Sequence, residues 1–93
     1  MNIPTLRLTI DDVDFQIICL LSERIKIVQK ICDLKAKNNI PVYQPKRESL
    51  MLKKRKTFAK KYGLRDQFIL DLFVRIFEES RYVQEECQSP LKK

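Results

Sequence analysis

The first third of the chain carries an apolar pattern that only a long, projecting α-helix satisfies. Over residues 5–38, apolar side chains recur at alternating spacings of three and four, which places them on one helical face. Such a helix, rising about 1.5 Å per residue, is a rod of roughly 50 Å. A compact chain of 93 residues measures only about 30 Å across. We therefore expect this helix to extend beyond the core of its own chain.

The apolar stripe of this helix continues along its whole length. Its central members are Ile10, Ile17, Leu21, Val28 and Ile31. The part that projects needs a cover, and a second copy of the chain is the simplest one. The pattern predicts an intertwined homodimer in which the long helices pair.

Two shorter helices are expected at residues 45–61 and 65–87. Pro45 suits a first helical position, and Gly63 follows the end of the second helix. The third helix has an inward face of Ile69, Leu72, Phe73, Ile76, Phe77 and Val83. Residues 88–93 contain Pro90 and little to bury, so we expect a frayed tail. The prediction is an all-α fold of three helices in a single domain, residues 1–93.

The ends of the long helix also carry signals. Thr5 follows Pro4 and is the expected N-cap, with Asp11 and Asp12 on the side that the helix dipole favours. Asn38 and the Pro that follows shortly after it predict the stop, because Pro cannot continue the hydrogen-bond ladder and Asn tolerates a left-handed conformation.

The composition excludes several classes of site. A single glycine and the absence of histidine exclude a His-based triad, a His zinc site and glycine-rich nucleotide loops. Cys19, Cys32 and Cys87 are odd in number and widely spaced, so we expect inert buried thiols with no disulfide and no metal site. We expect no cofactor.

No segment predicts a membrane or export role. The longest apolar runs are far shorter than the ~20 residues that a membrane span needs. Residues 1–12 lack a basic start followed by an apolar stretch, so we expect no signal peptide and a cytoplasmic protein.

The positive charge is concentrated in one segment. The chain has a formal net charge of +7, and residues 46–61 hold eight cations and one acid, so the rest is neutral. Such a helix could follow phosphates or raise the local concentration of an anionic substrate. A solvated, mostly lysine helix face is the simpler explanation, and we favour it.

Three cations interrupt the apolar stripe of the long helix. They are Arg7, Arg24 and Lys35, and Asp14 is the only acid on that line. A buried cation needs an anion or a route to water. Lys35 follows Arg24 by about 16 Å along the axis and ~20° around it, so both could reach one small ligand. Arg7 lies about 25 Å before Arg24 and could reach that ligand only from an antiparallel partner chain.

Further polar residues fit the same kind of site. Ser80 and Gln84 continue the inward stripe of the third helix, although Ser often bonds its own backbone and Gln84 could lie at the surface. Arg47 and Glu48 stand in the first turn of the second helix, where the dipole favours Glu48 alone. This inventory holds no nucleophile–base pair. It suits anion binding, or a reaction that needs only shape and charge.

Taken in order with their spacings, these residues resemble the all-helical (AroQ-type, type II) chorismate mutases. The resemblance spans residues 6–87. The matching segments are Leu6-Arg7, Ile10-Asp11-x-Val13-Asp14, Leu20-Leu21-x-Glu23-Arg24, Lys35, Pro41-Val42, Arg47-Glu48, Gly63-Leu64 and Phe77-Glu78-Glu79-Ser80-x-x-x-Gln84. It implies an intertwined dimer with two active sites. It also implies an isomerase: the Claisen rearrangement of chorismate to prephenate on the way to phenylalanine and tyrosine.

The resemblance further implies roles for the substrate-binding residues. Arg24 and Arg7 of the partner subunit would clamp the carboxylates, with Arg47 nearby. Lys35 and Gln84 would donate to the ether oxygen, and Lys35 would also touch a carboxylate.

The remaining implied contacts concern the ring hydroxyl and one carboxylate. Glu48 would accept from the hydroxyl, and Ser80 would assist at the carboxylate. Gln44 stands where the family often has Asp, and its backbone N–H would contact the hydroxyl. Because Gln is a poorer N-cap than Asp, this corner departs from the family pattern.

Two alternatives stay open. An isochorismate-pyruvate lyase resembles the same fold, but that branch tends to lack the counterparts of Glu48 and Ser80. A helical nucleic-acid binder would use Lys53–Lys56 and Lys60–Lys61, but it does not explain the polar residues on inward stripes. We therefore favour chorismate as the ligand and do not expect nucleic acid as the partner.

Overall fold

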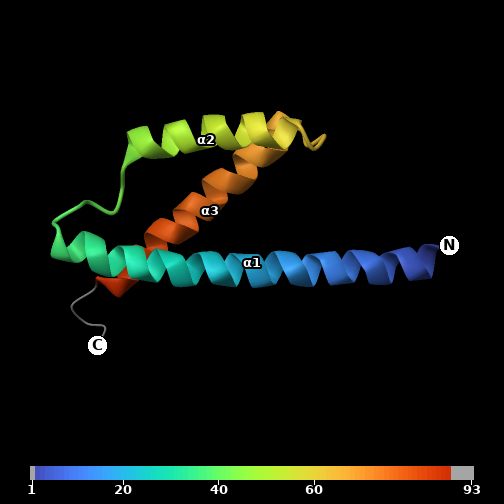
Figure 1. Ribbon diagram of the computed structural model, residues 1–93, viewed down its shortest axis with the longest axis horizontal. Helices are drawn as coiled ribbons and strands as arrows, with labels where there is room; N and C mark the ends of the chain where they lie inside the picture. The colour runs from blue at the N-terminus through green and yellow to red at the C-terminus, as the bar shows by residue number, and fades with distance from the viewer. Residues whose placement is uncertain (1, 89–93) are drawn as a thin grey trace.

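The computed structural model describes residues 2–88, which form three α-helices and no strand. These are α1 (Ile3–Lys37), α2 (Pro45–Lys60) and α3 (Asp66–Cys87) (Figure 1). The all-α prediction is confirmed, and each helix end lies within two residues of the expected position. The expected frayed tail falls almost wholly on residues 89–93, outside the described part.

The start of α1 differs from the prediction. Asn2 caps the helix in place of Thr5, and its side-chain oxygen accepts a hydrogen bond from the Thr5 N–H at 3.0 Å. Pro4 stands in the first turn, where its missing N–H costs no hydrogen bond. The first turn consequently has no acidic residue, so Asp11 and Asp12 lie beyond the reach of the dipole.

The two connections have the conformations that the sequence indicates. After α1, Asn39 adopts φ 55° and the Ile40 N–H donates to the Lys35 carbonyl at 2.9 Å. After α2, Gly63 adopts φ 75° and the Leu64 N–H donates to the Ala59 carbonyl at 3.3 Å. Both turns use the left-handed region, which Asn and Gly tolerate. They return the chain so that α3 runs back between α1 and α2.

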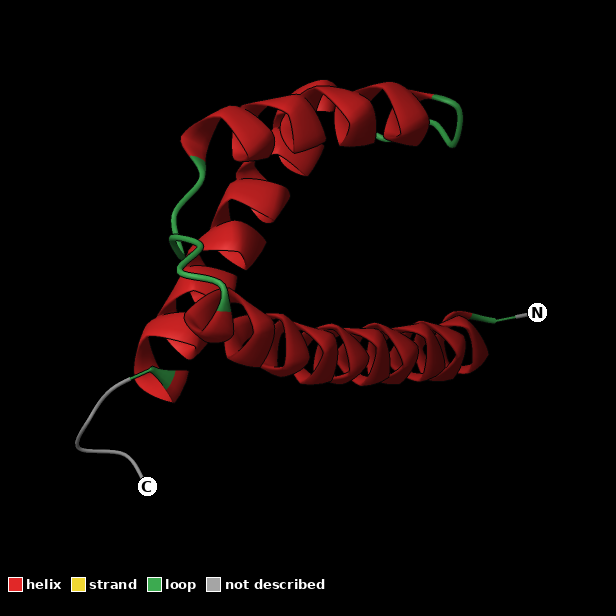
Figure 2. Cartoon of the chain, turned by 60° about the vertical axis from the view of Figure 1, so that its left-hand side comes forward, coloured by secondary structure: helices red, strands yellow, loops and turns green. Residues whose placement is uncertain are grey.

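Helix α3 is the element on which the other two pack. It crosses diagonally from the end of α2 to the C-terminal half of α1 (Figure 1), and within the described residues α1 and α2 do not pack on each other. The apolar core is correspondingly small, formed by Val28, Cys32, Ala59, Ile69 and Phe77. Helices α1 and α2 lie on opposite sides of the molecule, and α3 connects them (Figure 2).

The N-terminal half of α1 extends away from the rest of the molecule. The chain measures 54 × 30 × 15 Å, and its radius of gyration is 16.6 Å, against about 12 Å for a compact chain of this length. Apolar side chains on this arm stay exposed, Ile10 by 58% and Ile17 by 50%. The predicted projection of the first helix is thus confirmed. None of the three described helices has a stretch that is both long and apolar enough to cross a membrane.

Some residues expected inside are not buried in the single chain. Leu72 is 41% exposed and lies with Leu21, Ile25 and Ile76 in an apolar hollow between α1 and α3. Of the three thiols, Cys32 is buried, Cys87 is half-buried and Cys19 is exposed on the projecting arm. The expectation of three buried thiols is wrong, because the arm has no intrachain neighbour among the described residues to cover Cys19.

Candidate active site

A pocket of about 260 Å³ lies between α1 and α2 against the C-terminal half of α3. It receives side chains from all three helices and from the segment that joins α1 to α2. Seven of the eight residues predicted from the sequence line it: Arg24, Lys35, Gln44, Arg47, Glu48, Ser80 and Gln84. The structure therefore brings together residues that are up to 60 positions apart in the sequence.

Arg7 is the predicted residue that lies elsewhere. It is exposed on the projecting arm of α1, seventeen residues before Arg24, and does not line the pocket. At about 1.5 Å per residue that separation is about 25 Å, beyond the reach of one arginine side chain. Within one chain, Arg7 therefore stays outside the site.

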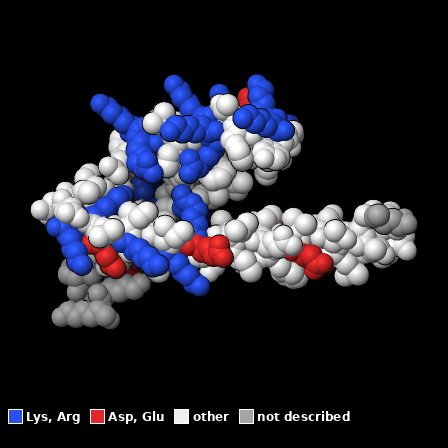
Figure 3. All heavy atoms as spheres, viewed as in Figure 1, with Lys and Arg blue, Asp and Glu red and all other residues white. Residues whose placement is uncertain are grey.

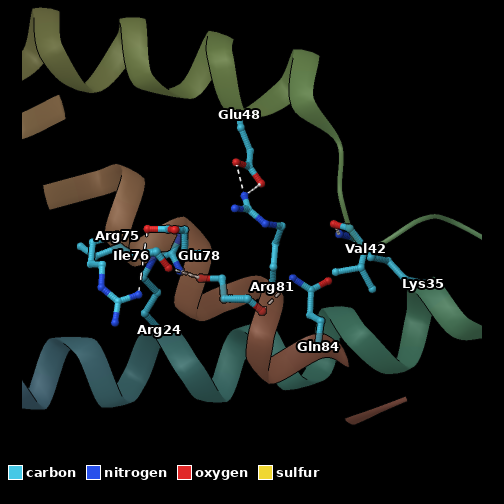
Figure 4. A network of polar contacts seen from close by, with 10 residues as sticks. Arg24, Lys35, Val42, Glu48, Arg75, Ile76, Glu78, Arg81 and Gln84 are labelled. Atoms are coloured by element: carbon cyan, nitrogen blue, oxygen red, sulfur yellow. Dashed lines mark hydrogen bonds and ion pairs between the residues drawn. The ribbon is translucent and has the colours of Figure 1, made fainter. Parts of the chain in front are cut away.

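Arg24 enters the pocket from α1 and is held there by α3. Its Nη1 donates to the Ser80 hydroxyl, which in turn donates to the Ile76 carbonyl at 3.0 Å (Figure 4). The guanidinium carbon lies 5.7 Å from the centre of the Phe77 ring. Burial lowers the pKa of Arg24, and the positive charge of Arg55 lowers it further. Ser80 thus bonds its own helix and orients Arg24 at the same time.

Lys35 approaches the pocket from the last turns of α1. Its Nζ donates to the Val42 carbonyl at 3.2 Å, which ties it to the segment before α2 (Figure 4). The pKa of Lys35 is lowered first by burial and next by the positive charge of Arg47. An anion in the pocket would oppose both effects, because it favours the charged ammonium.

Gln84 is buried, with 6% of its surface exposed, and only half of its amide is bonded. Its Nε2 donates to the Ser80 carbonyl at 3.2 Å, whereas its Oε1 is buried without a partner among the described residues. A buried amide oxygen without a donor costs about 1–3 kcal/mol. The Nε2 carries a second N–H that the described bonds leave unused, and this N–H is available as a donor to a ligand.

Glu48 is paired with a residue that the sequence did not single out. The Arg81 Nη1 lies 2.5 Å and 2.6 Å from the two carboxylate oxygens of Glu48 (Figure 4). The Arg81 guanidinium carbon lies 4.6 Å from the centre of the Tyr43 ring. The hydrogen bond to Glu48 raises the pKa of Arg81. The pair links α2 to α3 and fixes the Glu48 carboxylate at the edge of the pocket.

Arg55 is the second lining residue that was missed as a site residue. Its Nη1 donates to the Met51 carbonyl of its own helix at 3.3 Å. Its guanidinium carbon lies 5.4 Å from the Phe73 ring centre and 5.5 Å from that of Phe77. The sequence spacing does indicate Arg55 as a site residue, because it follows Glu48 by seven residues and so shares its helical face.

The lining is strongly positive. Five cations face it, namely Arg24, Lys35, Arg47, Arg55 and Arg81, against one lining carboxylate, Glu48, which is already paired with Arg81. Within residues 2–88, no group of three His, Cys, Asp or Glu side chains could hold a metal ion. The lining contains donors and charge, with a single carboxylate acceptor. Such a pocket fits a small molecule that carries more than one negative group.

Comparison with known proteins gives a consistent result. The family described as chorismate mutase type II matches residues 6–85. A T-protein of Enterobacter agglomerans is 33% identical over 85% of the chain, and a bifunctional chorismate mutase/prephenate dehydratase of Buchnera aphidicola is 37% identical over 89%. The chain spans only 21% and 22% of these two relatives. A chorismate mutase of Methanocaldococcus jannaschii is 25% identical over 99% of the chain and 97% of its own length.

Proposed function

Because the chain belongs to the chorismate mutase type II family, we propose that it converts chorismate to prephenate, on the way to phenylalanine and tyrosine. The observation that carries the proposal is the convergence of Arg24, Lys35 and Arg47 on one small pocket. Chorismate is a dicarboxylate, so this excess of cations matches its charge. Because the sequence lacks histidine, the site must work without a His base, and this reaction does not require one.

The proposed reaction suits a site that acts only by holding the substrate in one conformation and by placing charges around it. Chorismate rearranges in one unimolecular step, in which a C–O bond breaks while a C–C bond forms. The reactive conformer is compact, and negative charge develops on the ether oxygen as the C–O bond breaks. Holding that conformer removes an entropic cost, and donors fixed near the ether oxygen stabilise the transition state.

The cations have distinct proposed roles. Arg24, oriented by Ser80, and Arg7 of the partner subunit would clamp the two carboxylates, with Arg47 nearby in the first turn of α2. Lys35 would donate to the ether oxygen and touch a carboxylate, and the amide of Gln84 would also donate to the ether oxygen.

The hydroxyl end of the substrate is assigned to the start of α2. Glu48 would accept from the ring hydroxyl, with Arg81 holding its carboxylate in place. The backbone N–H of Gln44 would contact the same hydroxyl, and Ser80 would assist at a carboxylate. Gln44 makes no side-chain cap to α2, which agrees with a backbone role for this residue.

The proposed active unit is a homodimer. The apolar stripe on the projecting arm of α1 supports it, because such a long exposed row is covered in a stable protein. Antiparallel pairing of the arms would carry Arg7 of the partner subunit towards the pocket that lacks it. The site would then be completed across the interface, and a cytoplasmic location stays a prediction from the sequence.

The direct test supplies chorismate and isochorismate separately to the purified chain. We expect prephenate from chorismate and no salicylate from isochorismate, because Glu48 and Ser80 both line the pocket. Lys35→Ala should lower kcat by ~10²–10³, the loss of one preorganised donor. Lys53→Ala, at an exposed position of α2, is the matched control and should keep full activity. Salicylate without prephenate would assign the lyase reaction instead.

A further inference from the structure

Arg55 is a cation on the face of α2 where a helix ordinarily places apolar residues. The pocket-facing row of α2 runs from Glu48 through Met51 to Arg55 and then to the buried Ala59. Lys53 and Lys54, which lie on other faces of α2, are exposed, as a solvated basic face requires. The general lysine surface visible over α2 in Figure 3 therefore does not account for Arg55.

The contacts of Arg55 leave most of its hydrogen-bonding capacity unused. A guanidinium carries five N–H donors, and the described bonds of Arg55 use one, to the Met51 carbonyl. No carboxylate forms an ion pair with it in the part of the chain that the structure describes. Its planar group rests against Phe73 and Phe77, which fixes its position from the apolar side and leaves its edge free for a ligand.

A second guanidinium approaches the same aromatic ring. Both the Arg24 and the Arg55 guanidinium carbons lie within 6 Å of the Phe77 ring centre, one from α1 and the other from α2. Their mutual repulsion contributes to the lowered pKa of Arg24. Two like charges in a half-buried pocket repel at a cost that an anion between them removes.

We propose that Arg55 is a further substrate-binding residue, which joins Arg24 in binding one carboxylate of the dianionic substrate from the opposite wall of the pocket. This inference rests on the proposed function for the identity of the substrate. It adds a residue that has no role in the proposed mechanism so far. Arg81 has no such role, because Glu48 already neutralises it.

The test separates charge from packing at this position. Arg55→Met keeps an unbranched apolar side chain against Phe73 and Phe77 but removes the guanidinium. Arg55→Lys keeps the positive charge but loses the planar guanidinium, which can bind a carboxylate through two parallel N–H groups. Lys54→Met is the control, because it removes the same charge from the exposed face of α2. Steady-state kinetics with chorismate, calorimetric titration with prephenate, the unfolding midpoint and the mass in solution are measured for each variant.

Arg55→Met is expected to raise KM for chorismate roughly tenfold or more and to weaken prephenate binding by a similar factor. Its kcat should change much less, since binding to a carboxylate that does not react is nearly equal in ground and transition states. For Arg55→Lys, the KM for chorismate and the affinity for prephenate should lie between those of the wild type and those of Arg55→Met. For Lys54→Met, both quantities should match the wild type. Unfolding midpoints and dimer mass should be unchanged.

Three outcomes overturn the inference. If the wild type converts chorismate and Arg55→Met behaves as Lys54→Met does, Arg55 is not a substrate ligand, while the proposed function stands. If the wild type neither converts chorismate nor binds prephenate, the proposed function fails, and the inference fails with it. Where Arg55→Met does not fold, Arg55→Lys decides: a folded dimer with wild-type KM and prephenate affinity overturns the inference.

Discussion

At the scale of single residues, the site is organised by polar groups that hold other polar groups. Ser80 orients Arg24, Arg81 holds Glu48, and the Val42 carbonyl holds Lys35. Each link joins two different elements, so the geometry of the pocket depends on how the helices pack. Charges fixed in this way need little reorganisation when an anion binds, which is what electrostatic catalysis requires.

The pH dependence of the reaction should report the environment of Lys35. Its pKa is lowered below the ordinary 10.5, so the ammonium loses its proton earlier as pH rises. We expect kcat/KM to fall on the alkaline side with a midpoint below 10.5. In Arg47→Met the overall rate drops, but the midpoint should move upwards, because the charge of Arg47 is the second cause of the lowered pKa after burial.

The pH profile of kcat/KM for both proteins checks this expectation, since it reports ionisations of the free enzyme. Lys46→Met is the control: it removes one charge from the neighbouring position and should leave the midpoint in place. An alkaline midpoint that is the same in Arg47→Met and Lys46→Met would show that Arg47 does not act on the titrating group.

Not every residue of the site could be predicted from the sequence. Arg24, Lys35, Ser80 and Gln84 were predictable because each interrupts an apolar stripe, and a polar group on a buried face needs a partner. Arg81 stands one position after Ser80, off that stripe, so its pairing with Glu48 depends on how α2 packs on α3. No spacing in the sequence contains that information.

At the scale of elements, helix ends were more predictable than their capping residues. Pro45 and the left-handed Asn39 and Gly63 mark the boundaries through their own backbone preferences. The sequence predicts Thr5 as the N-cap of α1 on the premise that Pro4 precedes the helix. Pro fits inside the first turn equally well, and Asn2 then becomes the capping side chain.

Gly63 should be the residue of the α2–α3 turn that tolerates substitution least. It has φ 75°, while a Cβ added there would meet no atom within 4 Å. The cost of Gly63→Ala is therefore backbone strain alone, which we expect to lower the free energy of unfolding by about 1 kcal/mol. Gly63→Asn should cost less, because Asn tolerates the left-handed region.

Urea unfolding at one fixed protein concentration measures both variants, since a dimer's stability depends on concentration. Activity at low temperature should be unchanged, because Gly63 does not line the pocket. Equal destabilisation by Ala and Asn would mean that the turn is limited by something other than φ.

At the scale of the whole molecule, two features of the single chain support the proposed homodimer. The projecting arm of α1 exposes an apolar row, and the pocket lacks the one predicted residue that this arm carries, Arg7. Antiparallel pairing of two arms would cover the apolar row and would also bring Arg7 of the partner subunit to the pocket. The pairing stays a prediction of the sequence, made from helix length and stripe length, which are read directly from the residues. The relative orientation of the two chains depends on surfaces that no single chain determines.

The shared site predicts complementation between two inactive variants. Arg7→Ala lacks the residue supplied across the interface, and Arg24→Ala lacks the one supplied from the pocket's own chain. A heterodimer of the two has one pocket with both arginines and one pocket with neither. Random exchange makes half of the dimers mixed, so we expect about a quarter of wild-type activity to return.

The measurement mixes the two purified variants, allows the chains to exchange, and follows prephenate formation over time. Differently tagged chains give the heterodimer fraction independently, and recovered activity should rise in proportion to it. Mixing either variant with itself is the control and should restore nothing. Complete exchange without recovered turnover would place Arg7 outside the active site, whatever the oligomeric state. Recovery in step with exchange would show that Arg7 acts in the pocket of the partner subunit.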